Sequence, residues 1–209
     1  MKADPKVVIL ANGLFPAAQE GLDHLRSADL LICCDGAADK LIAEGMVPHV
    51  IVGDMDSVSD EVREQYKSIM IQSDDQENND LTKAVHYCIE RAYTSVSILG
   101  ATGMREDHTL GNISLMLEYY PRIEVQIISD YGVFSLVHSG EQHPSFVGEK
   151  ISIFSIDSKV RVSSTGLKYP LDKLQLSSWY RATLNEATAD HFTLIFGSDL
   201  PLIVYKAWR

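Results

Sequence analysis

The sequence predicts an α/β domain with a mainly parallel sheet, followed by a small antiparallel β-sandwich domain. Through about residue 130, short β-branched runs alternate with segments whose apolar residues recur every three or four positions. This alternation is typical of a parallel sheet with crossover helices. From about residue 131 the chain changes to short β-rich segments separated by Gly, Pro, Ser and Asp. We therefore expect two domains, at 1–130 and 131–209.

Six strand-like runs mark the first domain, at 7–11, 30–34, 50–52, 69–71, 96–99 and 125–128. Apolar periodicity predicts helices between them, at 38–42, 59–66, 81–92 and 108–117. In the last helix we expect Leu110, Ile113 and Leu117 to face the core. The strands expected in the second domain lie at 132–137, 150–156, 159–162, 191–196 and 201–206.

Composition narrows the class of protein. With 209 residues, 45% hydrophobic and 22% charged, the chain has the composition of a soluble globular protein. A formal net charge of -11 argues against nonspecific binding to nucleic acid or to anionic membranes, which requires surplus Lys and Arg. No segment approaches a membrane span, and the run at 7–11 is too short for a secretory signal. Cys33, Cys34 and Cys88 are sparse and lie in apolar segments, so we expect reduced core thiols in a cytoplasmic protein.

Acidic residues follow the third run, in the motif Gly53-Asp54-Met55-Asp56-Ser57. In open α/β sheets ligands bind at the carboxyl ends of the strands, and two carboxylates two residues apart can share one hard divalent cation. The motif also fits a plain helix start, in which Ser57 or Ser59 caps the next helix and the aspartates are favourable near its N-terminus. Taken alone, the motif does not choose between a metal site and a helix start.

Other strand ends carry residues of the same character. Asp35 follows the second run, Asp80 opens the helix after the fourth, and Arg105, Asp107 and His108 follow the fifth. Because the carboxyl ends of parallel strands meet at one edge of the sheet, we expect these side chains to lie close together.

Each of these residues also has a plainer role. Asp80 is a good N-cap for its helix, and His108 could likewise cap or pack. Lys83 is either solvated on the polar face of that helix or an ammonium that holds a phosphate beside the backbone N–H groups. Arg105 is either an ordinary surface residue or a bidentate hydrogen-bond donor to a phosphate.

Motifs of this kind extend over nearly the whole chain. In order they are Cys34-Asp35-Gly36-Ala37-Ala38, Gly53-Asp54-Met55-Asp56-Ser57, Asp75-Gln76, Asn79-Asp80-Leu81-Thr82-Lys83-Ala84, Gly100-Ala101-Thr102-Gly103-Met104-Arg105-Glu106-Asp107-His108, Gly166-Leu167-Lys168-Tyr169-Pro170-Leu171 and Thr183-Leu184-Asn185-Glu186. In order and spacing they resemble the motifs of the thiamine pyrophosphokinase family. The chain departs from that family's usual residues at Ala37, Asn79, Met104, Tyr169 and Thr183. Tyrosine can still stack and threonine keeps a hydroxyl, so the last two changes preserve the chemistry of the thiamine side.

The resemblance implies transfer of a pyrophosphoryl group from ATP to the hydroxyl of thiamine, with Mg²⁺, giving thiamine diphosphate and AMP. It also implies a homodimer whose active sites lie between subunits. The first domain would carry the catalytic, nucleotide and metal sites, and the second would serve thiamine binding and dimerisation.

The implied site residues fall into four groups. The catalytic residues are Asp54, Asp56, Asp80 and Lys83. The Mg²⁺ ligands are Asp54, Asp56, Asp80 and Asp35. The nucleotide-binding residues are Asn12, Asp35, Gly36, Lys83, Thr102, Arg105, Asp107, His108 and Asn112. The thiamine-binding residues are Gln76, Tyr169, Thr183 and Asn185.

Two other functions stay open. The run Asp54-Met55-Asp56-Ser57-Val58 fits the D-x-D-x-[TV] pattern of aspartyl-phosphate phosphohydrolases, in which the first aspartate is a nucleophile. That pattern normally follows the first strand, whereas here it follows the third. A non-catalytic sensor of thiamine or nucleotide would keep the pocket without turnover. A Walker A motif is absent from the sequence, so a P-loop kinase is not supported.

Overall fold

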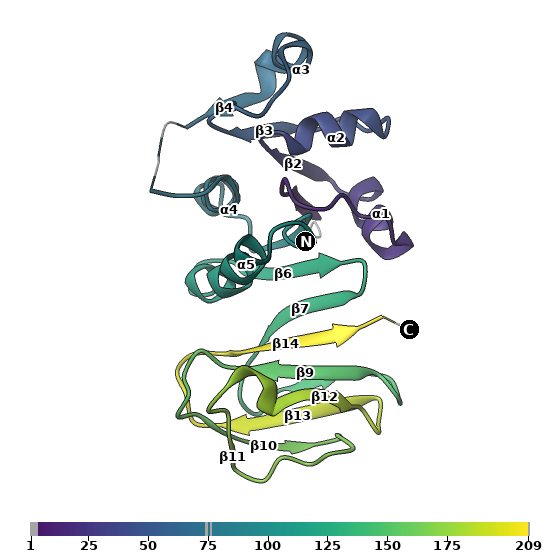
Figure 1. Ribbon diagram of the computed structural model, residues 1–209, viewed down its shortest axis with the longest axis vertical. Coiled ribbons are helices and arrows are strands. Elements are labelled where there is room, and N and C mark those ends of the chain that lie inside the picture. The colour runs from purple at the N-terminus through teal and green to yellow at the C-terminus, as the bar shows by residue number, and fades with distance from the viewer. Residues whose placement is uncertain (1–3, 74, 76, 209) are drawn as a thin grey trace. The chain divides into compact units, whose positions relative to one another are not determined.

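The computed structural model describes residues 4–73, 75 and 77–208, in two compact units that divide after Asp130 (Figure 1). The first unit is α/β and the second is β-rich. Within the described residues, no helix combines the length and the apolar character needed to cross a membrane.

The first unit is built on a parallel sheet. Its described strands are β1 (Val7–Leu10), β2 (Leu30–Cys34), β3 (Val50–Gly53), β4 (Met70–Gln72), β5 (Ser95–Leu99) and β6 (Glu124–Ser129). They follow the order β6-β5-β1-β2-β3-β4, and every neighbouring pair is parallel. A parallel sheet covered by helices is buried on both faces, which is why its strands are continuous aliphatic runs. Ile9, Ile32, Ile51 and Ile98 accordingly have no exposed surface.

Helices connect these strands. They are α1 (Gln19–Arg26), α2 (Ala37–Ala43), α3 (Asp60–Tyr66), α4 (Asp80–Glu90) and α5 (Glu106–Tyr119), with a short 3-10 helix η1 at Lys67–Ile69. Helix α4 packs against β2 and β3 and buries Leu81, Ala84, Val85 and Cys88. It ends at Glu90, two residues before the predicted end, so Ala92, which was expected on the same stripe, is exposed. The thiols of Cys33, Cys34 and Cys88 are free and buried, as expected for core cysteines.

Two helices differ from the prediction. In α5, Ile113 and Leu117 are buried, but Leu110 is 53% exposed, so the inward position predicted for it was wrong. The buried stripe begins at Asn112, because the first turn of α5 borders an open pocket. Helix α1 was not predicted, since only Gly21 and Leu25 are buried along its eight residues and most of the others are polar.

The strand order reverses at β1. Strands β2, β3 and β4 extend from one side of β1, whereas β5 and β6 lie on the other. In an open α/β sheet such a reversal leaves a crevice outside the carboxyl ends of the two strands, because their connections leave in opposite directions. The segments after β1 and β5 therefore border the place where a ligand is expected.

The second unit contains two antiparallel sheets, of order β12-β9-β14-β7 and β11-β10-β13-β8. The strands are β7 (Gly132–Val137), β8 (Gln142–Pro144), β9 (Lys150–Phe154), β10 (Arg161–Thr165), β11 (Leu174–Gln175), β12 (Ala182–Glu186), β13 (His191–Phe196) and β14 (Leu202–Ala207), and a 3-10 helix η2 spans Trp179–Arg181. Ile151, Phe192 and Val204 belong to one core cluster that draws on both sheets, which is the packing of a β-sandwich. The predicted fold class is confirmed, although the short strands β8, β11 and β12 were not predicted.

Candidate active site

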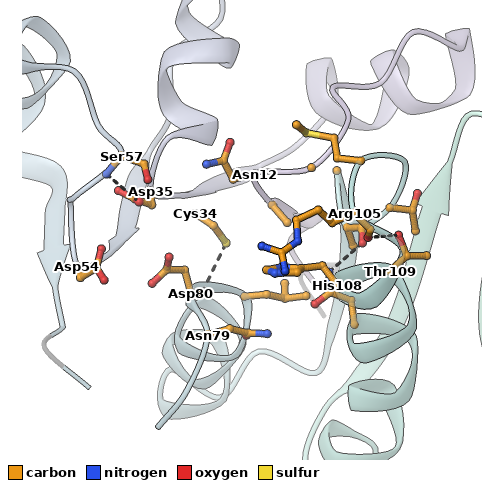
Figure 2. Close-up of a pocket in the computed structure, with 18 of the residues that line it drawn as sticks. Asn12, Cys34, Asp35, Asp54, Ser57, Asn79, Asp80, Arg105, His108 and Thr109 are labelled. Atoms are coloured by element: carbon orange, nitrogen blue, oxygen red, sulfur yellow. Dashed lines mark hydrogen bonds between the residues drawn. The ribbon is translucent and has the colours of Figure 1, made fainter. Parts of the chain in front are cut away.

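A pocket of about 350 Å³ lies at the carboxyl edge of the parallel sheet (Figure 2). The segments that follow β1, β2, β3 and β5 line it, together with the first turns of α4 and α5. The predicted site residues on this lining are Asn12, Asp35, Asp54, Asp56, Asp80, Thr102, Arg105, His108 and Asn112. Gly36, Lys83 and Asp107 were also predicted as site residues, but they are not on the lining.

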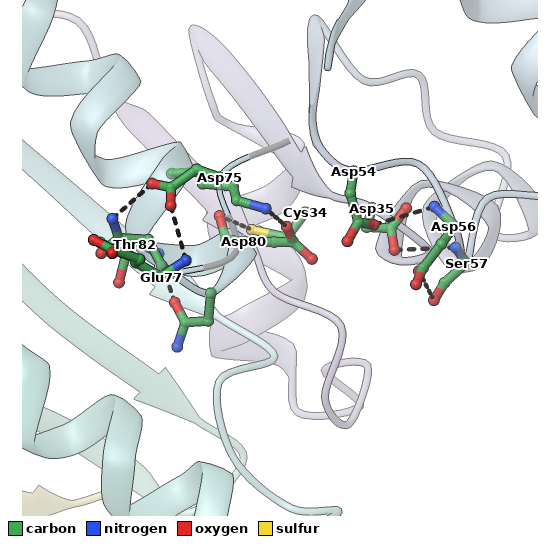
Figure 3. Close-up of polar contacts among 12 residues, drawn as sticks. Cys34, Asp35, Asp54, Asp56, Ser57, Asp75, Glu77, Asp80 and Thr82 are labelled. Atoms are coloured by element: carbon green, nitrogen blue, oxygen red, sulfur yellow. Dashed lines mark hydrogen bonds and ion pairs between the residues drawn. The ribbon is translucent and has the colours of Figure 1, made fainter. Parts of the chain in front are cut away.

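Three carboxylates converge on one side of the pocket (Figure 3). Carboxylate oxygens of Asp35, Asp54 and Asp56 all lie within 4.8 Å of one another. Between the last two, Met55 is buried and has a φ of 69°, a left-handed conformation that costs a residue with a side chain about 1 kcal/mol or more. The guanidinium of Arg63, on α3, donates a hydrogen bond to the Met55 carbonyl and holds this turn in place.

Asp35 is the buried member of the cluster, at 3% exposure. One of its oxygens, Oδ2, accepts a hydrogen bond from the Ser57 backbone N–H at 3.2 Å, whereas its buried Oδ1 has no hydrogen-bond partner among the described residues. Burial raises the pKa of Asp35 to about 6, against the opposing effect of the Ser57 hydrogen bonds. Oxygen ligands are those that hard divalent cations prefer, so a buried carboxylate oxygen facing two further carboxylates fits such a cation.

The helix-start interpretation of this motif is also correct. The Ser59 hydroxyl caps α3 by accepting the Val62 N–H at 3.3 Å. The aspartates lie ahead of the cap, where the Ser57 hydroxyl donates to Asp56 at 2.8 Å and lowers the pKa of that carboxyl. A capped helix and an acidic cluster thus occur in the same segment.

At the start of α4 the cap is Asn79, whose side-chain oxygen accepts the Thr82 N–H at 2.8 Å. The N-cap role considered for Asp80 was therefore wrong, and its carboxylate faces the pocket while accepting the Lys83 ammonium at 3.0 Å. The Lys83 side chain is only 7% exposed, which excludes a solvated role. Burial alone would lower the pKa of Lys83, but the hydrogen bond to Asp80 and nearby carboxylates raise it, so the ammonium stays charged. Asp80 and Lys83 thus form a fixed ion pair at the pocket wall.

The loop after β5 forms the opposite wall. Arg105 donates to both oxygens of Asp107, from Nη2 at 2.6 Å and from Nε at 3.1 Å. These hydrogen bonds lower the pKa of Asp107 to about 2 and raise that of Arg105. The buried Asn112 side chain donates to the Ala101 carbonyl at 2.8 Å. Asp107 and Asn112 therefore order the loop, while Arg105 and His108 stay exposed on it.

Three of the four residues expected on the thiamine side, Tyr169, Thr183 and Asn185, belong to the second unit. Asn185 is 3% exposed, and its amide both donates to the Tyr169 carbonyl at 2.8 Å and accepts the Tyr169 N–H at 3.1 Å. The Thr183 hydroxyl donates to the Tyr180 carbonyl at 2.9 Å, and the ring of Tyr169 is exposed. Asn185 thus fixes the main chain that carries an exposed tyrosine. Gln76 lies outside the described residues.

Sequence reasoning missed two basic residues near the pocket. Arg63 holds the Met55 carbonyl, and Lys40, on α2, donates to the carbonyls of Asn12 and Gly13. Their acceptors are main-chain oxygens, which every residue type carries. Nothing in the sequence therefore marks these pairs.

Family profiles match both units. One, described as the catalytic domain of thiamin pyrophosphokinase, matches residues 22–127, and another, described as its substrate-binding domain, matches residues 132–205. Thiamine pyrophosphokinase 1 of Oryza sativa subsp. japonica is 31% identical over 181 residues, covering 72% of this chain and 68% of that protein. Thiamin pyrophosphokinase 1 of Caenorhabditis elegans is 26% identical and covers 96% of this chain and 91% of its own.

Solved structures share the fold. Thiamine pyrophosphokinase from Bacillus subtilis has a TM-score of 0.79 at 24% identity, covering 98% of this chain and 99% of that one. Yeast thiamin pyrophosphokinase has a TM-score of 0.81 at 15% identity, covering 100% of this chain and 88% of that one. Because the two profiles together span most of the sequence, the chain belongs to the thiamin pyrophosphokinase family.

Proposed function

We propose that the pocket of the first unit binds ATP with Mg²⁺, and that the protein transfers a pyrophosphoryl group from ATP to the hydroxyl of thiamine. Family membership makes the chain an ATP-dependent diphosphotransferase. The observation that carries the assignment to this pocket is the cluster of Asp35, Asp54 and Asp56, whose buried Asp35 Oδ1 has no hydrogen-bond partner in the part of the chain that the structure describes.

We assign the metal to this cluster. Asp35, Asp54 and Asp56 would hold Mg²⁺, with Asp80 on the neighbouring wall of the same pocket. Held by these residues, Mg²⁺ would neutralise the negative charge that the phosphate oxygens carry and that develops during transfer. A formal net charge of -11 makes this neutralisation necessary, because the protein otherwise repels a polyphosphate.

Two basic side chains serve the phosphates, one by direct contact and one through an ion pair. Asp107 occupies Nε and Nη2 of Arg105, so Nη1 is the donor that we expect on a phosphate oxygen. Lys83 acts through its ion pair, since its ammonium holds the Asp80 carboxylate in one orientation. Asn12, Thr102 and His108 are the further nucleotide contacts that the lining offers.

The chemical step begins at the thiamine hydroxyl. One carboxylate of the cluster accepts the hydroxyl proton as the oxygen attacks the β-phosphorus of ATP. The bond between the β-phosphorus and the oxygen bridging to the α-phosphorus breaks, and AMP leaves with that oxygen. Acidic residues also suit the other substrate, because the thiazolium ring of thiamine is cationic. The chain's acidity therefore helps to bind one substrate, while metal and basic residues bind the other.

The second unit completes the proposal. Tyr169, Thr183 and Asn185, with Gln76, are the residues that the family resemblance assigns to thiamine. The same resemblance supports a homodimer with active sites between subunits. Three buried cysteines without disulfide bonds support a cytoplasmic location, where reducing conditions keep thiols from forming disulfides.

The test is product analysis. Purified protein with thiamine, Mg²⁺ and ATP should form thiamine diphosphate and AMP in equal amounts, resolved by chromatography. ADP accumulating with thiamine monophosphate would show attack at the γ-phosphorus instead. The phosphohydrolase alternative is not favoured by the family match, and it alone predicts trapping of beryllofluoride on Asp54. If the protein does not consume ATP in the presence of thiamine, the non-catalytic sensor becomes the favoured function.

A further inference from the structure

Lys40 stands beside the pocket without lining it. It lies on α2, the helix that begins two residues after Asp35. Its ammonium donates to the Gly13 carbonyl at 2.9 Å and to the Asn12 carbonyl at 3.1 Å, with the Met104 sulfur at 4.0 Å. Across residues 4–73, 75 and 77–208, no ion pair joins Lys40 to a carboxylate.

These two carbonyls belong to the turn that follows β1, at the strand reversal. The other side of the turn is tied to the β5 loop, where Gly13 N–H donates to the Gly100 carbonyl at 2.7 Å and Leu14 N–H to the Thr102 carbonyl at 3.0 Å. The approach is so close that a Cβ on Gly13 would lie 2.2 Å from the Gly100 oxygen. Lys40 therefore holds one side of a turn whose other side is already fixed.

The turn matters because its front forms the pocket wall. Asn12 and Gly13 line the pocket, and the Asn12 amide reaches the corner after β2, where a Cβ on Gly36 would lie 2.8 Å from it. Lys40 thus connects the helix that begins at the acidic cluster to the wall at the strand reversal. The Lys40 ammonium gives up part of its hydration to donate to two uncharged carbonyls, and its side chain is held in one conformation. A lysine on the open surface would keep both its hydration and its rotamer freedom. Its burial, which lowers the pKa of Lys40, is consistent with a structural constraint at this point.

We propose that Lys40 is a positioning residue that fixes the turn at Asn12 and Gly13 and thereby sets the affinity of the pocket for the nucleotide. This inference rests on the proposed function, since it takes the ligand at this wall to be ATP. It is distinct from a direct phosphate contact, because the ammonium is committed to the back of the turn.

The experiment compares Lys40→Met, Lys40→Arg and the control Lys67→Met, which removes an exposed ammonium from the same unit. We would measure kcat, the KM values for ATP and thiamine, and the dissociation constant for Mg-ATP by calorimetry. Lys40→Met should weaken Mg-ATP binding and raise the KM for ATP about tenfold, with kcat and the KM for thiamine within about threefold. Lys40→Arg should recover most of the affinity, because its guanidinium can reach both carbonyls.

Other results would overturn the inference. Unchanged ATP affinity in Lys40→Met, or equal losses for ATP and thiamine, would show that Lys40 serves general stability or nothing measurable. A fall in kcat with unchanged ATP affinity would point to a direct role in the chemical step. Should Lys40→Met not fold, the arginine variant decides by itself, since the inference requires it to fold and bind Mg-ATP nearly normally. Failure of the proposed function is separate, because the unmodified protein would then not convert ATP to AMP.

Discussion

Asp35→Asn should stabilise the metal-free protein while removing its activity. The substitution keeps an oxygen that can accept the Ser57 N–H and removes a charge that is 3% exposed and faces two other carboxylates. Groups that are needed to bind a ligand are often unfavourable when the ligand is absent, and their removal then raises stability.

The magnitude follows from the pKa. A carboxyl whose pKa rises from 3.8 when unfolded to about 6 when folded binds protons more tightly in the folded state. The contribution of this carboxyl to the free energy of unfolding is therefore fully present below pH 3.8 and is lost as the pH rises through about 6. Above that pH the loss reaches about 3 kcal/mol, and at pH 5 it is roughly half as large. Asp35→Asn should recover up to this amount.

The assay is thermal and urea unfolding in EDTA at pH 8 and pH 5, with the exposed Asp199→Asn as the control. At pH 8 the melting temperature of Asp35→Asn should exceed that of the unmodified protein by roughly 5 °C, with a smaller gain at pH 5. Mg-ATP should raise the melting temperature of the unmodified protein and not that of the variant. A variant less stable than the unmodified protein at pH 8 in EDTA would refute the reasoning, because the carboxylate would then stabilise the fold without metal.

Three further predictions concern other positions. Asp54→Asn and Asp56→Asn should each cut turnover by roughly a hundredfold or more, since they remove metal charge and no core volume, and neither variant should unfold more easily than the unmodified protein in EDTA. Normal turnover in either would remove that residue from the metal site. Asn185→Ala should destabilise the protein by about 2 kcal/mol, because the Tyr169 main chain loses buried partners, and should raise the KM for thiamine far more than that for ATP; equal increases would contradict a thiamine-side role. Burial lowers the pKa of His143, against an opposing effect of Glu141, and its ring lies 5.5 Å from that of Phe192 with Nε2 unpartnered among the described residues. The folded state therefore loses stability as the pH falls below about 6.5, and His143→Gln should reduce this loss where the control His24→Gln does not; parallel pH curves would be the contrary result.

Much of the fold was predictable because parallel strands, buried on both faces, must be aliphatic. Hydrophobic patterns did not predict the elements that are only partly buried or only a few residues long. Strand β8, at Gln142–Pro144, has no apolar alternation, and β12 contains Leu184 with a φ of 58° and 78% exposure. Neither segment carries the signal from which a strand is predicted.

The acidic side of the site was predictable for a different reason. Strand ends in a parallel sheet meet at one edge, so the positions of Asp35 and Asp54 followed from the strands, and that of Asp80 from the start of the helix that follows the fourth strand. Details of the helix starts did not follow. Asn79 and Asp80 are both good N-caps, and only the structure shows that Asn79 takes the cap and leaves the Asp80 carboxylate to Lys83.

What the sequence could not reveal is how the strained backbone around the cluster is held. Asp35 and Met55 both have left-handed backbone conformations, with φ values of 44° and 69°, which residues with side chains rarely adopt. Arg63 holds the Met55 carbonyl, and the Ser57 N–H holds the Asp35 carboxylate, so the unfavourable conformations are maintained from outside the cluster. A carboxylate cluster that repels itself would relax if its backbone were free to move. Because groups outside the cluster hold that backbone, the oxygens stay close together, and the free energy that this costs on folding would be recovered on binding a metal ion.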